Sequence, residues 1–102
     1  MSTIVVADPL ALIAEGVSAR LGEEPDLTVS GHARTGNALL ELLKTERPDL
    51  VLLEVSLPEM DGIDTMRAVR KNHPEQAVLA FSALTDIEYV NSMLIEGAIG
   101  YL

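Results

Sequence analysis

Two carboxylates and a hydroxyl in this sequence are of the types that bind a cation or a phosphoryl group. Each follows a short apolar run: Asp8 after 3–7, Glu54 after 50–53 and Ser82 after 77–81. Glu54 stands out, because a charged residue directly after four aliphatic ones is costly to bury without a partner. Carboxylate and hydroxyl oxygens are the ligands that Mg²⁺ prefers. If the runs are parallel strands of one sheet, their carboxyl ends bring these side chains to one edge.

Short apolar runs alternate with amphipathic segments along the whole chain. The runs predict strands at residues 3–7, 27–33, 50–53, 77–81 and 99–102. Strands that are apolar on both faces are typical of parallel sheets covered by helices on both sides. With right-handed crossovers, the sequence predicts an α/β fold with a doubly wound, five-stranded parallel sheet.

The segments between the runs have the spacing of helices. Apolar residues share one face in the first three, at Leu10, Ile13, Val17 and Leu21, then Leu39 and Leu43, then Ile63, Met66 and Val69. Thr35 and Asp61 stand where caps of the second and third helices are expected. Thr85 and Glu88 have capping-box spacing for a fourth helix. We also expect a last helix after the fifth strand to cover that edge, and this helix is missing from the sequence.

Composition limits the class of protein. With 102 residues the chain is long enough for one domain with one core. Its formal charge of −9 repels phosphate backbones and anionic lipid, so we expect no membrane binding and no DNA binding by this domain itself. Cysteine is absent, and no apolar run is long enough to cross a bilayer. We expect a cytoplasmic protein.

Three stretches resemble response regulator receiver domains. Residues 51–62 (VLLEVSLPEMDG) are similar to their third strand and following loop, and residues 97–102 (GAIGYL) to their fifth strand. Residues 10–16 resemble the first helix of the subfamily that carries a LuxR-type helix-turn-helix. The resemblance implies a flavodoxin-like receiver fold over residues 1–102 and a role in two-component phosphorelay signalling. It also implies a DNA-binding domain attached beyond this stretch, through which the protein controls transcription.

The resemblance also implies roles for site residues. Glu54 stands where the family has the aspartate that accepts a phosphoryl group from a histidine kinase. The acidic pair that helps to hold Mg²⁺ is here Asp8–Pro9, so its second member is lost. Ser82 is at the position of the switch hydroxyl and Tyr101 at that of the aromatic switch. The family's switch lysine is expected just after Leu102, outside the sequence.

Two departures from the family pattern weaken the expected chemistry. The extra methylene of Glu54 moves its carboxylate oxygens by roughly 1 Å, and a displacement that small can cost about 10²-fold in rate. Pro9 supplies no anionic ligand, so Mg²⁺ would bind weakly, through Asp8, Glu54, the backbone carbonyl region of Ser56 and water. The resulting interpretation is an atypical pseudo-receiver, not an enzyme, in which Glu54 partly imitates a phosphoryl group.

Alternatives remain open at this stage. One is a conventional Mg²⁺-dependent phosphoacceptor with a histidine kinase as partner. Another is a small α/β nucleotide-binding enzyme, although no glycine-rich phosphate loop follows the first strand. Asp8 could simply cap a helix and Pro9 begin it, and Tyr101 could be a packing residue.

Receiver domains are expected to pair as homodimers through the face formed by residues 85–102.

Overall fold

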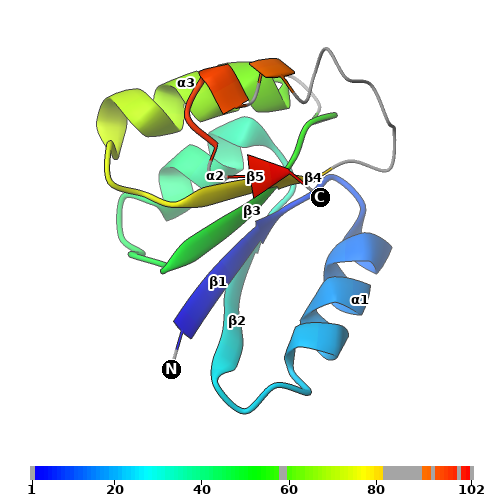
Figure 1. The fold of residues 1–102 in the computed structure, drawn as a ribbon. Helices are drawn as coiled ribbons and strands as arrows, with labels where there is room; N and C mark the ends of the chain where they lie inside the picture. The colour runs from blue at the N-terminus through cyan, green and yellow to red at the C-terminus, as the bar shows by residue number, and fades with distance from the viewer. Residues whose placement is uncertain (1, 58–59, 82–90, 93, 99, 102) are drawn as a thin grey trace.

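The computed structural model describes residues 2–57, 60–81, 91–92, 94–98 and 100–101. Its strands are β1 (Ser2–Ala7), β2 (Leu27–Ala33), β3 (Leu50–Glu54), β4 (Val78–Phe81) and β5 (Gly100–Tyr101). They form one sheet in the order β2-β1-β3-β4-β5, and all neighbouring pairs are parallel (Figure 1). The parallel α/β fold predicted from the alternation is confirmed. Of the fifth strand, predicted at 99–102, the structure describes Gly100–Tyr101, beside four longer strands.

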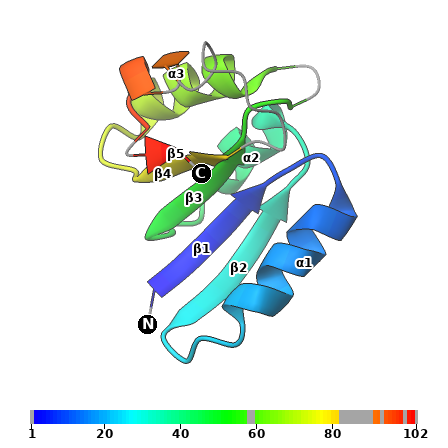
Figure 2. The same ribbon diagram turned by 45° about the vertical axis from the view of Figure 1, so that its right-hand side comes forward.

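Three helices cover the two faces of the sheet. They are α1 (Ala11–Leu21), α2 (Gly36–Leu42) and α3 (Gly62–Asn72). Helices α2 and α3 lie together on one face, and α1 lies on the other face beside β2 (Figures 1 and 2). Residues 91–92 and 94–95 are also helical, whereas Thr85 and Glu88, predicted to begin that helix, lie outside the described residues.

The two faces of the sheet differ in how well they are covered. Under α2 and α3 the side chains are fully buried, at Val5, Val51, Leu53, Val78 and Ala80. On the α1 side, Leu50, Leu79 and Phe81 are only partly buried. Alternate residues of a strand point to opposite faces, so in β3 and β4 these partly buried residues all lie on the face toward α1. The main core therefore lies between the sheet and the pair α2 and α3.

Side-chain caps begin two of the helices, as the sequence predicts. Thr35 Oγ1 accepts a hydrogen bond from the backbone N–H of Ala38 at 3.0 Å. Asp61 Oδ1 accepts one from the N–H of Asp64 at 2.9 Å. Each cap satisfies one of the N–H groups that have no partner within the helix. The cap of α3 also fixes where the loop after β3 ends.

The start and the buried face of α1 differ from the prediction. The helix begins at Ala11 with Leu10 as its N-cap, so Pro9 lies before the helix rather than in its first turn. Leu10 and Ile13, predicted to face the core, are 60% and 40% exposed, and Ala14 is the buried residue of the helix. Val17 and Leu21 of the same predicted face pack against the core on this side of the sheet. However, no described helix lies beside that flank to bury it.

A close approach between helices sets the position of the loop after β3. A Cβ atom on Gly36 would lie 2.1 Å from Oγ1 of Thr65, which is fully buried in α3. A Cβ atom on Gly62 would lie 2.6 Å from the Cα of Val55. These two glycines let α2, α3 and the start of the loop pack against one another without a side chain between them.

Substitution of Gly36 by alanine should lower the free energy of unfolding by roughly 1–3 kcal/mol, the usual cost of overpacking a core. The matched control is Gly16→Ala in α1, where a Cβ meets nothing within 4 Å. That change should be neutral or stabilising, because alanine favours a helix more than glycine does. Urea denaturation of both variants measures the difference. Equal stability of the two would contradict the close approach of α2 and α3.

Candidate functional site

The register of β1 and β3 brings the two predicted carboxylates to one edge of the sheet. Ala7 is registered with Leu53, so Asp8 and Glu54 are the next residues on adjacent parallel strands. The Asp8 N–H donates to the carbonyl oxygen of Ala33 at the end of β2. Both carboxylates therefore lie at the carboxyl end of the central strands, where parallel sheets place their ligand sites.

Asp8 is held in a tight turn that leads from β1 into α1. Its side chain is buried, and Oδ1 accepts a hydrogen bond from the N–H of Leu10 at 2.7 Å. The bond spans two residues, with Pro9 between, which is an Asx-turn. The Asp8 carbonyl oxygen accepts a hydrogen bond from the Nε2 of His32 at 2.9 Å. Because a carbonyl can only accept, His32 carries its hydrogen on Nε2 here.

Glu54 is buried as the last residue of β3, with 7% of its surface exposed. Alternation along the strand puts it on the same face as Leu50 and Leu52, the face of α1. Its Oε1 accepts a hydrogen bond from the N–H of Ser56 at 3.1 Å. The carboxylate is thus turned toward the loop that follows its own strand.

Neither carboxylate has a cation beside it in the part of the chain that the structure describes. The ion pairs there join other residues, namely Arg20–Glu23, Lys44–Glu41, Arg67–Asp64 and Arg67–Glu96. A buried carboxylate is costly unless its charge is paired or bonded. Asp8 and Glu54 each have a backbone N–H in that role, which compensates only part of the cost.

The described side chains at this edge supply only part of a magnesium site. Among the described residues, no group of three or more His, Asp or Glu side chains could hold a metal ion. Pro9 adds no oxygen from its side chain, and one oxygen of each carboxylate is already bonded to an N–H group. Mg²⁺ takes six oxygen ligands in near-octahedral geometry, and two buried carboxylates supply a minor part of that set.

Other predicted site residues are placed less completely. Ser82 lies outside the described residues. Tyr101 lies in β5, where its backbone pairs with that of Ala80 in β4, and its side chain is not described. Ser56 donates its N–H to Glu54, a contact that the sequence did not predict, and the metal-binding role of its carbonyl stays a prediction. His32 also lies at this edge, through its bond to the Asp8 carbonyl oxygen, and no signal in the sequence links it to Asp8.

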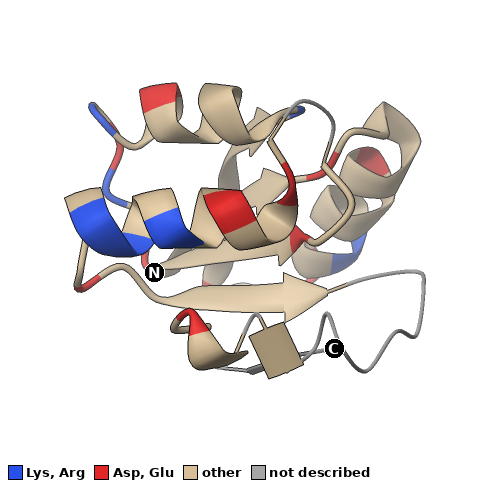
Figure 3. Cartoon of the chain, turned by 90° about the horizontal axis from the view of Figure 1, so that it is seen from above, with Lys and Arg blue, Asp and Glu red and all other residues tan. Residues whose placement is uncertain are grey.

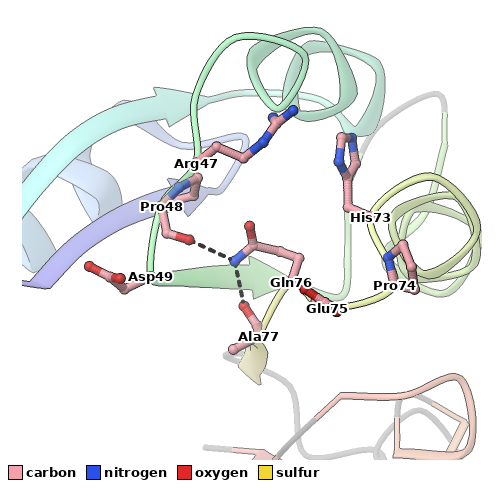
Figure 4. Close-up of a pocket in the computed structure, with 8 residues that line it drawn as sticks. All are labelled: Arg47, Pro48, Asp49, His73, Pro74, Glu75, Gln76 and Ala77. Atoms are coloured by element: carbon pink, nitrogen blue, oxygen red, sulfur yellow. Dashed lines mark hydrogen bonds between the residues drawn. The ribbon is translucent and has the colours of Figure 1, made fainter.

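A separate cleft of about 470 Å³ lies at the opposite, amino-terminal edge of β3 and β4 (Figure 4). Its lining combines both charges and is formed by Arg47, Pro48, Asp49, His73, Pro74, Glu75, Gln76 and Ala77. Gln76 Nε2 crosses it and donates to the carbonyl oxygens of Pro48 at 3.1 Å and Ala77 at 3.0 Å. These bonds join the segments before β3 and β4, so the cleft is distant from Asp8 and Glu54.

Residues 4–102 match the family model of the response regulator receiver domain. The chain belongs to this family. It is 34% identical to the nitrate/nitrite response regulator NarL of Escherichia coli over 99% of its own length and 47% of that protein. It is 33% identical to the transcriptional regulatory protein DegU of Brevibacillus brevis over 97% of its length and 42% of that protein. This receiver domain therefore spans less than half of the curated relatives that it matches.

Solved structures agree with this assignment. The receiver domain of a NarL response regulator from Mycobacterium tuberculosis superposes with a TM-score of 0.91 and 38% identity, over 99% of this chain and 82% of that one. A LuxR-family response regulator from Aurantimonas superposes with a TM-score of 0.94 at 23% identity, which shows the shared fold.

In the described residues, no helix is long and apolar enough to cross a membrane.

Two substitutions of Asp8 should distinguish the contribution of its hydrogen bond to stability from that of its charge. Asp8→Ala removes the acceptor for the Leu10 N–H and should lower the free energy of unfolding by about 1 kcal/mol, as for a lost cap. Asp8→Asn keeps an acceptor oxygen and removes a buried charge without a described cation, so its stability should equal or exceed that of the original chain. Urea denaturation at pH 7 measures both. If Asp8→Asn is as unstable as Asp8→Ala, the charge has a stabilising partner.

Proposed function

We propose that this receiver domain signals without phosphorylation, with Glu54 as a permanent negative charge at the position of the phosphoacceptor. The observation that carries the proposal is the hydrogen bond from the Ser56 N–H to Glu54 Oε1 in a buried setting. The carboxylate that would attack a phosphodonor is already engaged by the backbone.

Three features of the site argue against ordinary phosphoryl transfer. The Glu54 side chain is one methylene longer than aspartate, and a shift of roughly 1 Å can cost about 10²-fold in rate. It is 7% exposed, which restricts the approach of a phosphodonor. Phosphoryl transfer depends on cations that neutralise the developing charge, and the described donors fall short of a magnesium site. Weak Mg²⁺ binding through Asp8, Glu54 and the Ser56 carbonyl remains a separate proposal, open to titration.

The same features support a role for the charge itself. An anion at position 54 lies beside the loop of residues 55–61, which continues into the N-cap of α3. A phosphoryl group in the family would place negative charge at this strand end. The output that we propose is pairing of receiver domains through the face of residues 85–102, with Ser82 and Tyr101 responding to the charge. Transcription would be controlled through an attached DNA-binding domain, in line with the names of the NarL and DegU relatives.

Incubation with Mg²⁺ and a small phosphodonor should leave the intact mass of the protein unchanged. The matched control is the double variant Pro9→Asp with Glu54→Asp, which restores both acidic positions of the family pattern and should gain one phosphoryl group. Intact-mass spectrometry reads both samples. A gain in the original chain would restore the conventional Mg²⁺-dependent, kinase-driven function, and peptide mapping would then identify the acceptor.

Glu54→Gln should weaken pairing and transcriptional output while leaving the fold unchanged. Glutamine keeps one oxygen that can accept from the Ser56 N–H and replaces the other with an NH2 donor group, so this hydrogen bond can persist while the charge is removed. The control is Glu75→Gln, which removes an equal charge from an exposed position at the opposite edge of the sheet. Sedimentation velocity and a promoter reporter in the full-length protein measure the effect. Equal behaviour of the two variants would show that the Glu54 charge does no signalling.

A further inference from the structure

The turn that leads into β5 is held by contacts with α3. Glu96 and Gly97 follow the helical residues 91–92 and 94–95, and Gly97 has a φ angle of +111°, in the region that favours glycine. Ala98 comes next and is buried in the core under α2 and α3. Any displacement of this turn would therefore move a core residue and the strand after it.

Arg67 on α3 contacts the first residue of the turn. Its Nε lies 2.9 Å from Oε1 of Glu96, whose side chain is 25% exposed, and its Nη1 lies 3.6 Å from Oδ1 of Asp64. The hydrogen bond and the charge of Glu96 raise the pKa of Arg67 above its usual value. The contact with Asp64 is local to the helix, whereas the contact with Glu96 joins positions 29 residues apart.

Arg70, one turn later on α3, contacts the second residue of the turn. Its Nη2 donates to the carbonyl oxygens of Gly97 at 2.8 Å and Gln76 at 3.3 Å, and Nη1 donates to that of Pro74. One guanidinium thus joins the end of α3, the segment before β4 and the turn before β5. The planar fork of an arginine can hold several carbonyls at once, which a lysine cannot do in the same geometry.

Gly97 leaves no room for a side chain beside this guanidinium. A Cβ atom there would lie 2.6 Å from Nε of Arg70. Residues three apart share one face of a helix, so Arg67 and Arg70 reach the turn from the same side of α3. Helix α3 has Asp64 in its first turn and Arg70 and Lys71 in its last turn, and Figure 3 shows how acidic and basic residues are distributed over the chain.

We propose that Arg67 and Arg70 are positioning residues that fix the Glu96–Gly97 turn, and with it β5, relative to α3. Helix α3 begins where the loop after Glu54 ends, and the Gly62 N–H donates to the Val55 carbonyl oxygen at 2.7 Å. The helix therefore contacts the candidate site at one end and the entry to β5 near the other. The inference rests on the proposed function only where it connects β5 with the pairing face.

The test must be local rather than a measurement of overall stability. Exposed ion pairs contribute on the order of 0–1 kcal/mol, so loss of Arg67–Glu96 hardly changes unfolding of the whole domain. Amide hydrogen exchange reports on opening of separate segments. The amides of Ala98, Gly100 and Tyr101 report on the turn and β5, and those of β1 and β3 report on the domain.

Arg67→Glu and Glu96→Arg should each speed exchange at these three amides by about two- to fivefold, the range that an ion pair of this kind supports. The double variant with the charges exchanged should restore slow exchange. The matched control is Lys44→Glu, which breaks an exposed pair with Glu41 at 2.8 Å within one segment and should leave β5 unchanged. Arg70→Lys, which keeps the charge and loses the fork, should also speed exchange at β5.

Three results would overturn the positioning role. They are unchanged exchange at β5 in both Arg67→Glu and Arg70→Lys, an equal rise in β1 and β3, and no recovery in the charge-exchanged variant. Sedimentation of the same variants in the full chain tests pairing separately. If β5 responds but the original chain does not pair, the positioning role stands and the proposed pairing function fails.

Discussion

The register that pairs Ala7 of β1 with Leu53 of β3 determines where the two carboxylates of the candidate site lie. It places Asp8 and Glu54 side by side at the end of the sheet, and both are buried there. With no described cation nearby, the backbone must compensate, through the N–H groups of Leu10 and Ser56. Each hydrogen bond therefore holds both the position of a carboxylate and the conformation of the loop that follows it.

Most of the fold could be predicted because local signals agree with one another. Apolar runs, and Thr35 and Asp61 as caps, are each visible in a few neighbouring residues, and the structure has all of them. The exposure of Leu10 and Ile13 could not be predicted in the same way. Spacing identifies the side of a helix that favours burial, but only a neighbouring element provides the burial itself.

The candidate site was predictable in its residues and not in its contacts. Asp8 and Glu54 were identified because a charge after an apolar run is conspicuous. The bond from Ser56 to Glu54 depends on the conformation of a loop, and the bond from His32 to the Asp8 carbonyl depends on the pairing of β2 with β1. The sequence alone predicts neither contact, because one requires a particular loop conformation and the other joins residues 24 positions apart.

The burial of Glu54 bears on why a charge is present at this position at all. Glutamine could accept the same hydrogen bond from Ser56 without the cost of a buried charge. The amide would also bring two N–H donors into the buried site, and these need acceptors. The property in which glutamate exceeds glutamine is its negative charge, placed where the loop toward α3 begins and where the family carries its phosphoryl group. Under the proposed function, Glu54 acts through its charge rather than through its hydrogen bond, and the contacts of Arg67 and Arg70 connect α3 with the turn before β5.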